Sequence, residues 1–147
     1  SSGVHMAQPN AESITACIGN ALESSGVKPD EIDYISAHAT ATDLGDISEA
    51  SAVTALFGER TTPISSLKGH LGHTLGASGA LEFIATLAML EKERLIPTRN
   101  LISPGAGCDM LSHIKPGEKH LVNTFSKNSF AFGGINTVIV GRRYLYG

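Results

Sequence analysis

The chain has 147 residues, the length of one domain, and 41% of them are hydrophobic, so it can bury a core. Its net charge is −3 and its eleven Lys and Arg residues are scattered, which disfavours nucleic acid as a partner. No apolar run approaches the ~20 residues of a membrane helix, and no export signal is visible. These features predict a cytoplasmic domain with neither a nucleic-acid nor a membrane partner.

Helical and strand patterns alternate along the chain. Pro9-Asn10 opens a segment with apolar residues at helical spacing, and Gly26 closes it. A turn at 28–30 leads into a short strand at 32–35. Later elements are two helices, 47–57 with Asp46 as N-cap and 80–90 with apolar residues at three-residue steps, and strands ending at Ser65 and covering 121–125 and 137–142.

The segment 97–117 is rich in Gly and Pro and predicts a long surface loop. The order of elements, closed by a hairpin-like pair of strands, predicts a layered α/β fold. Cys17 and Cys108 have no repeated spacing, so they predict neither a disulfide framework nor a metal site.

Three segments hold polar groups that packing alone does not explain. The first is His38-Ala39-Thr40-Ala41-Thr42, directly after the strand ending near Ile35. Open α/β sheets place ligands at this end of a strand. The alternative interpretation is that the histidine and the threonines merely cap a turn.

The second segment runs from Lys68 to Gly79 and precedes the strongest predicted helix. Its small residues allow close approach of backbones, and the positive end of the helix dipole favours a neutral imidazole. His70 and His73 are three residues apart, but zinc is disfavoured because no glutamate lies between them in a HExxH arrangement.

The third segment, 128–134, reads Asn-Ser-Phe-Ala-Phe-Gly-Gly. An aromatic residue followed by two glycines is typical of a mobile flap with a bulky tip, here Phe132. A turn with both phenylalanines in the core is the alternative, and it is the favoured interpretation for Phe130.

Together the three segments resemble, in order and spacing, the C-terminal half of the elongating β-ketoacyl-[acyl carrier protein] synthases. HATAT, KGHLGHTLGASG and NSFAFGGIN correspond to that family's His-Gly-Thr-Ser-Thr, Lys-Ser-x-x-Gly-His-x-x-Gly-Ala-x-Gly and Asn-Ser-Phe-Gly-Phe-Gly-Gly-Thr-Asn loops. Leu44-Gly45-Asp46 with Glu49 is similar to its Leu-Gly-Asp-x-x-Glu, and Asn100, Pro104 and Cys108 match its long loop. The resemblance implies the C-terminal half of a layered, thiolase-like α-β-α fold.

The resemblance implies a decarboxylative Claisen condensation in fatty acid or polyketide synthesis. His38 and His73 would donate ring N–H groups to the malonyl thioester carbonyl, and Lys68 and Glu49 would form an ion pair that orients them. Thr40 and Thr42 would bind the phosphopantetheine arm. Phe132 would gate the acyl pocket, beside Phe130 and Gly133, and its backbone N–H would form half of an oxyanion hole. No cofactor or metal is implied, and the partners would be acyl carrier protein and a second copy of the complete protein.

The nucleophilic cysteine of the family has no counterpart in this sequence. Thr15-Ala16-Cys17 matches the family's Thr-Ala-Cys only superficially, because Cys17 lies 21 positions before His38 in a helical pattern. Cys17 and Cys108 are therefore interpreted as packing residues. Residues 1–147 are expected to be the C-terminal half, with 1–6 as the end of a family strand and the N-terminal half as a missing partner.

Several residues depart from the family pattern, namely Ala39, Ala41, Asp43, Ala131 and Ile135. Ala131 replaces a glycine of the gate, which predicts a stiffer gate. Lys127 lies near the position of Glu82, where relatives can hold a monovalent cation. The hypothesis is that the Lys127 ammonium replaces that cation, and the alternative is an ordinary surface lysine.

Three other interpretations remain open. A non-catalytic partner similar to a chain-length factor is disfavoured by the presence of His38, Lys68, His73 and Glu49 together. A thiolase of another branch is disfavoured by the HATAT and FAFGG segments. The third is a stable domain with no activity of its own, which is the expectation for this chain in isolation.

Overall fold

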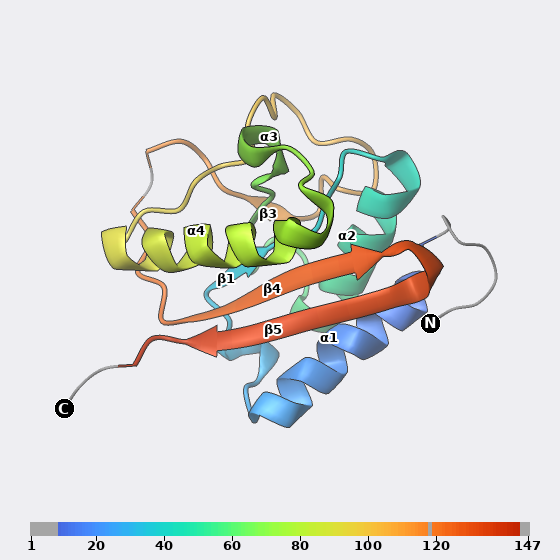
Figure 1. The fold of residues 1–147 in the computed structure, drawn as a ribbon, viewed down its shortest axis with the longest axis horizontal. Coiled ribbons are helices and arrows are strands. Elements are labelled where there is room, and N and C mark those ends of the chain that lie inside the picture. The colour runs from blue at the N-terminus through green and yellow to red at the C-terminus, as the bar shows by residue number, and fades with distance from the viewer. Residues whose placement is uncertain (1–8, 118, 145–147) are drawn as a thin grey trace.

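A mixed five-stranded sheet organises residues 9–117 and 119–144, which the computed structural model describes. The sheet order is β3-β2-β1-β4-β5, with the first four strands parallel and β5 antiparallel to β4 (Figure 1). This arrangement confirms the predicted closing pair of strands. The strands are β1 (Tyr34–Ser36), β2 (Pro63–Ser65), β3 (Ser112–His113), β4 (Thr124–Ala131) and β5 (Ile135–Arg142).

Helices cover both faces of the sheet and give the predicted layered α/β architecture. One face packs against α1 (Ala11–Ser25) and α2 (Asp43–Phe57), and the other against α4 (Ser78–Lys92), with the short α3 (Lys68–Leu71) above it (Figure 1). No helix in the described ranges is both long enough and apolar enough to cross a membrane.

The end of α1 follows the sequence signals, but the start of α2 does not. The Asn10 side chain accepts the Ser13 N–H at 2.8 Å, and Gly26 ends the helix in a left-handed conformation. Helix α2 begins at Asp43 with Thr42 as N-cap, so the prediction of Asp46 as N-cap was wrong. Asp43 and Asp46 both lie in its first turn, where a negative carboxylate interacts favourably with the positive end of the helix dipole.

Two predictions for the C-terminal third were also wrong. Strand β4 continues to Ala131 instead of ending at Phe125, because β5 pairs with it along its whole length. The loop 97–117 contains β3, which is only two residues long and pairs with β2. Two-residue strands carry no recognisable alternation of polar and apolar residues. The sequence resemblance proposed for residues 1–6 falls outside the described residues.

Successive residues of β1 and β4 point to opposite faces of the sheet, and each face has its own apolar core. Ile35 packs towards α1 and α2, whereas Tyr34 and Phe125 pack towards α4. Three fully buried polar residues, Ser126, Lys127 and Asn128, occupy the middle of β4. Because burying polar groups is costly unless they are paired, this stretch marks the site.

Candidate active site

Glu49 fixes the first polar segment at the carboxyl end of β1. His38 follows the last residue of this strand by two positions. The buried Glu49 carboxylate, on α2, accepts the backbone N–H of His38 at 3.0 Å and that of Ala39 at 2.8 Å. The Asn128 side-chain amide donates to the same carboxylate at 2.9 Å. Helix α2 therefore holds the His38 backbone through Glu49, and strand β4 holds Glu49 through Asn128.

The rest of this segment adopts a tight turn that opens onto a cavity. Ser66 Oγ donates to the Ala39 carbonyl at 2.8 Å, and the hydroxyls of Thr40 and Thr42 lie 3.1 Å apart. Ala41 has φ of 60°, a left-handed conformation that is uncommon for a residue with a side chain and that often occurs at functional sites.

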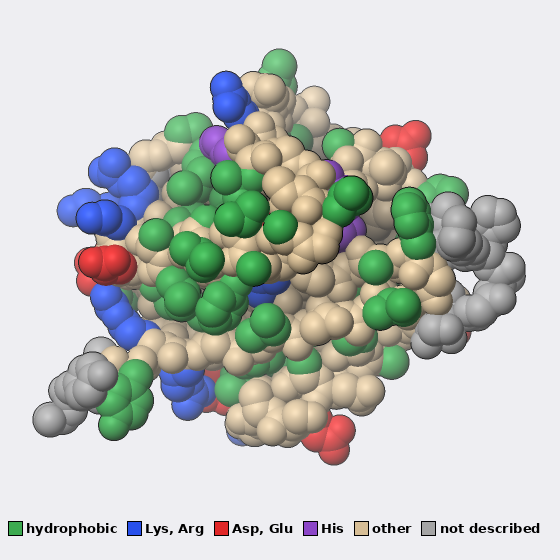
Figure 2. Space-filling model, in the orientation of Figure 1, with side chains coloured by type: hydrophobic (Ala, Val, Ile, Leu, Met, Phe, Trp, Pro, Cys, Tyr) green, Lys and Arg blue, Asp and Glu red, His purple; other side chains and the backbone are tan. Residues whose placement is uncertain are grey.

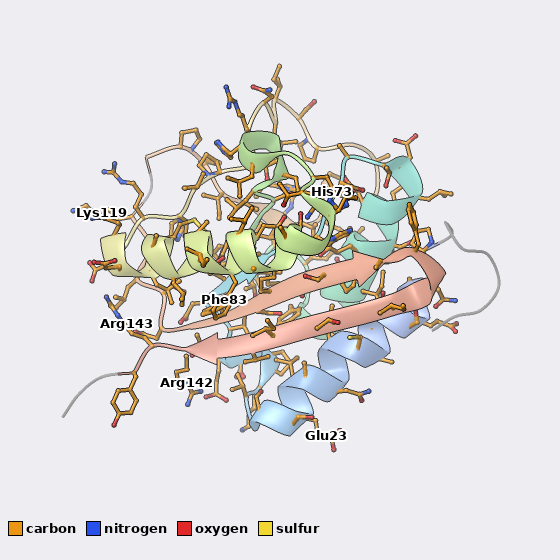
Figure 3. All side chains as sticks on the ribbon, in the orientation of Figure 1. Glu23, His73, Phe83, Lys119, Arg142 and Arg143 are labelled. Carbon is orange, nitrogen blue, oxygen red and sulfur yellow. The ribbon has the colours of Figure 1, made fainter. Side chains whose placement is uncertain are left out.

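His73 lies in the second segment, between α3 and α4, at the N-terminal end of α4 (Figure 3). Its Nδ1 accepts the Leu75 backbone N–H at 3.2 Å. The neutral ring must then carry its proton on Nε2, which leaves Nε2 as a donor. His70 does not share this environment, because its exposed ring contacts the Pro97 carbonyl.

The two histidine rings lie next to each other. The centroids of His38 and His73 are 5.7 Å apart with the planes at 84°, and the Phe130 ring lies 5.7 Å from His38 on another side. A cavity of about 660 Å³ is lined by both histidines and by Thr40, Thr42, Phe130 and Phe132. The fold thus brings six residues from three separate segments to one cavity.

The third segment comprises the end of β4 and the turn that leads to β5. Phe130 packs against the core, as predicted, whereas Phe132 is 71% exposed at the turn. Gly133 and Gly134 have positive φ, so glycine is favoured at both positions. Ala131 is in extended strand backbone, which an alanine adopts without strain.

Burial and nearby cations keep His38 neutral. Removal from water, together with the positive charges of Lys68 and Lys127 and the proximity of His73, lowers the pKa of His38 to about 3. A neutral imidazole donates one hydrogen bond and accepts another. His38 and His73 can therefore both act as neutral hydrogen-bond donors to an oxygen atom in the cavity.

The predicted ion pair between Lys68 and Glu49 is wrong. Lys68 Nζ lies 2.6 Å from Glu82 Oε1, and Lys127 Nζ lies 2.5 Å from Oε2 of the same carboxylate. The sheet explains the difference, because Glu49 comes from α2 on one face and Lys68 lies with α4 on the other. Lys127 is 1% exposed, so the alternative of a surface lysine is also wrong.

Asn128 and Ser66 also hold the site, although no sequence motif singled out their side chains for these roles. Asn128 holds Glu49, and Ser66 holds the Ala39 carbonyl. The signal that could have revealed Asn128 was the run of polar residues within β4. The predicted strand ended at Phe125, before that run.

Neither cysteine lines the cavity of the histidines. Cys17 lies on α1 and Cys108 borders a different cavity, and burial raises the pKa of both thiols. Neither thiol is thus activated as a nucleophile. In the described ranges, no group of three or more His, Cys, Asp or Glu side chains is placed to hold a metal ion.

The chain is similar to 3-oxoacyl-[acyl-carrier-protein] synthases over nearly its whole length. It is 38% identical over 140 residues to 3-oxoacyl-[acyl-carrier-protein] synthase 2 of Coxiella burnetii, and the match covers 92% of this chain and 34% of that protein. The chain therefore spans about a third of the length of this relative.

Solved structures show the same fold. A β-ketoacyl synthase from Burkholderia phymatum superposes with a TM-score of 0.92 at 43% identity, covering 99% of this chain and 36% of that one. A ketosynthase solved with its type II polyketide acyl-carrier protein gives a TM-score of 0.89 at 35% identity, covering 97% and 36%. The fold is thus the one expected for the C-terminal half of a thiolase-like ketosynthase.

The family model described as "Beta-ketoacyl synthase, C-terminal domain" matches residues 1–102. This segment contains the site residues His38, Thr40, Thr42, Glu49, Lys68, His73 and Glu82. The agreement of sequence, fold and cavity leads to one conclusion: the chain belongs to the β-ketoacyl synthase family.

Proposed function

We propose that this chain forms the malonyl-decarboxylating part of a β-ketoacyl-[acyl carrier protein] synthase. The observation that carries the proposal is the pair of adjacent histidine rings, His38 and His73, that line one cavity. The reaction is a decarboxylative Claisen condensation in fatty acid or polyketide synthesis. It needs no bound cofactor, because both substrates arrive as thioesters on a phosphopantetheine arm.

The chemistry requires stabilisation of an enolate oxygen. The bond between the malonyl carboxylate carbon and the α-carbon breaks, CO₂ leaves, and the electron pair forms the enolate. His38 and His73 donate ring N–H groups to the enolate oxygen, where paired donors in a water-poor site are most effective. The enolate carbon then attacks an acyl-cysteine thioester, the C–S bond breaks, and the cysteine thiolate leaves.

Other residues of the cavity bind and orient the substrates. Thr40 and Thr42 present adjacent hydroxyls to the phosphopantetheine arm of an acyl carrier protein. Phe132 lies at the exposed turn, beside Phe130 and Gly133, and gates the acyl pocket with its backbone N–H as half of the oxyanion hole. Glu49 positions the His38 backbone.

The nucleophile is supplied by a second segment of protein, the N-terminal half, which packs against α4. Leu81, Ile84 and Leu87 are exposed on this helix, and hydrophobic side chains gather over it (Figure 2). Contiguous exposed apolar surface is typical of an interface. The complete protein is proposed to be a homodimer. A non-catalytic role is disfavoured, because His38, His73, Lys68 and Glu49 are all present and held in place.

The test is decarboxylation of malonyl-[acyl carrier protein] by the complete protein, measured as CO₂ release. His38→Ala and His73→Ala should each lower the rate by about 10²–10³-fold, because each removes one donor to the enolate oxygen. His70→Ala is the matched control, since its ring lies outside the cavity, and its rate should stay within about twofold. Unchanged decarboxylation in both cavity variants would refute the proposal.

The isolated 147-residue chain should not condense acyl groups, because neither cysteine lines the cavity. Intact-mass spectrometry of the purified material shows first whether a second chain with a nucleophilic cysteine is present. Condensing activity from a sample that contains only the 15.4 kDa species would contradict this expectation.

A further inference from the structure

Lys127 is the most unusual residue of the buried polar stretch. It lies in the middle of β4, pairs in register with Ser36 of β1, and has 1% of its surface exposed. A buried ammonium is costly unless several oxygen atoms surround it. The reaction proposed above assigns no task to this residue.

Three oxygen atoms surround the Lys127 ammonium. It lies 2.5 Å from Glu82 Oε2, and it donates to the Asn128 carbonyl at 2.5 Å and to Ser129 Oγ at 2.9 Å. Ser129 in turn lies against Gly79 at the start of α4, where an added Cβ would be 3.4 Å from its hydroxyl. The ammonium therefore ties α4 to the part of β4 that leads to the Phe130 side of the cavity.

The charges around this site are unequal on the α4 face of the sheet. Lys127 and Lys68 share the single carboxylate of Glu82. Lys127 also pairs in register with Ser36, two residues before His38 in the chain, and both positive charges act on the His38 ring. The other groups that act on Lys127 or His38 are Glu49 from α2 and His73 from the α3–α4 segment. One carboxylate thus balances two ammonium groups.

We propose that Lys127 is a positioning residue, which anchors the end of β4 to α4 and supplies a fixed positive charge that keeps His38 neutral. This inference rests on the proposed function only for its consequence in catalysis. Burial lowers the pKa of Lys127 and the contact with Glu82 opposes this shift, and the close pairing of the ammonium with the Glu82 carboxylate favours its charged form. A protonated His38 would face two cations, so the neutral donor is favoured.

The first experiment measures the protonation of His38 in the isolated chain by NMR, with Lys127→Met as the variant. Methionine keeps the length of the side chain but removes the charge. The titration midpoint of His38, assigned with His38→Gln, should rise by about one pH unit. The matched control is Lys115→Met at an exposed position, which should leave the midpoint unchanged. An unchanged midpoint in folded Lys127→Met would overturn the proposal.

A second variant keeps the proposal testable if Lys127→Met does not fold. Lys127→Ala leaves room for propylammonium, which replaces the missing part of the side chain and its charge. Propylammonium should restore the folded state and the low His38 midpoint, whereas the neutral propan-1-ol, of the same size and at the same concentration, should not. Equal rescue by the alcohol, or no rescue by the amine, would show that the charge has no positioning role.

The complete protein separates this inference from the proposed function. In Lys127→Met the acid limb of the pH–rate profile for decarboxylation should move to higher pH, because His38 protonates more readily. A shifted midpoint in a protein without decarboxylase activity would support the role of Lys127 and refute the proposed reaction. An active Lys127→Met protein in which the His38 midpoint and the pH–rate profile are both unchanged would refute the role of Lys127 and support the proposed reaction.

Discussion

At the scale of single residues, two buried carboxylates hold the candidate site, and they do so from opposite faces of the sheet. Glu49 accepts two backbone N–H groups and the amide of Asn128, whereas Glu82 faces two lysines. Glu49 therefore orients a backbone, and Glu82 balances charge. Replacing Glu49 should therefore disturb the orientation of the backbone, whereas replacing Glu82 should disturb the balance of charge.

Glu49→Gln should lower the free energy of unfolding by about 1–3 kcal/mol, because the amide places an N–H₂ group against donors that need an acceptor. Urea denaturation of the chain, with the exposed Glu23→Gln on α1 as control, measures this loss. Stability equal to that of the unmodified chain would show that the three hydrogen bonds to Glu49 do not hold the segment.

The loss of stability in Glu49→Gln should also depend on pH, in a direction set by the pKa of Glu49. Burial raises the pKa of Glu49 above its ordinary value of 4.5, and the hydrogen bonds from Asn128, Ala39 and His38 oppose this shift. A raised pKa means that the folded state binds the proton more tightly, so this contribution to stability is fully present below pH 4.5 and is lost as pH rises through the folded pKa. The difference between the chain and Glu49→Gln should therefore shrink as pH rises above 4.5.

At the scale of elements, β4 is the strand that organises the site. Its alternate residues reach opposite faces, so the neighbours Lys127 and Asn128 contact carboxylates on different helices. The antiparallel partner β5 keeps this strand in place by pairing from Thr124–Arg142 to Ala131–Ile135. A substitution that weakens the pairing of β4 with β5 should therefore also disturb the cavity.

Gly141→Ala tests this pair. Gly141 lies opposite Phe125, and an added Cβ would overlap the Phe125 ring, which is buried in the core under α4. We expect a loss of about 1–3 kcal/mol in the free energy of unfolding. Gly19→Ala in α1 is the control, because nothing lies within 4 Å of its Cβ and alanine favours helix. If Gly141→Ala were as stable as Gly19→Ala, the packing of Phe125 over β5 would not be a constraint.

At the scale of the whole molecule, α4 has two apolar sides. Met89 and Leu90 are buried against the sheet, whereas Ile84 is 62% exposed on the side that faces away. The predicted three-residue steps of this helix therefore describe two different surfaces. Only one of them stabilises the described fold, and the other is the proposed interface.

Ile84→Lys should change the stability of the isolated chain by less than about 0.5 kcal/mol, because the side chain has few partners to lose. Leu90→Ala, at a buried position, should cost about 2–5 kcal/mol. With the N-terminal half supplied as a separate chain, Ile84→Lys should abolish association of the two halves and with it condensation, measured by light scattering and by formation of the β-ketoacyl product. The control Ile102→Lys, on an exposed loop, should leave both intact. Full association of the Ile84→Lys protein would place the interface elsewhere.

The sequence by itself determined the class of fold, the helix ends marked by Asn10 and Gly26, and the three segments that carry the histidines, threonines and phenylalanines. These features are local, since caps, turns and periodicity depend on residues only a few positions apart. The motifs of those segments were also sufficient to indicate the family.

Tertiary structure alone decided the partners of the buried charges. Lys68 pairs with Glu82 and not with Glu49, because the sheet separates the two carboxylates and no local pattern records which face a distant residue occupies. The length of β4 likewise depended on pairing with β5, which comes later in the chain. The facing of His38 and His73 has the same origin, because strand order, and not sequence distance, sets which loops meet at one end of a sheet.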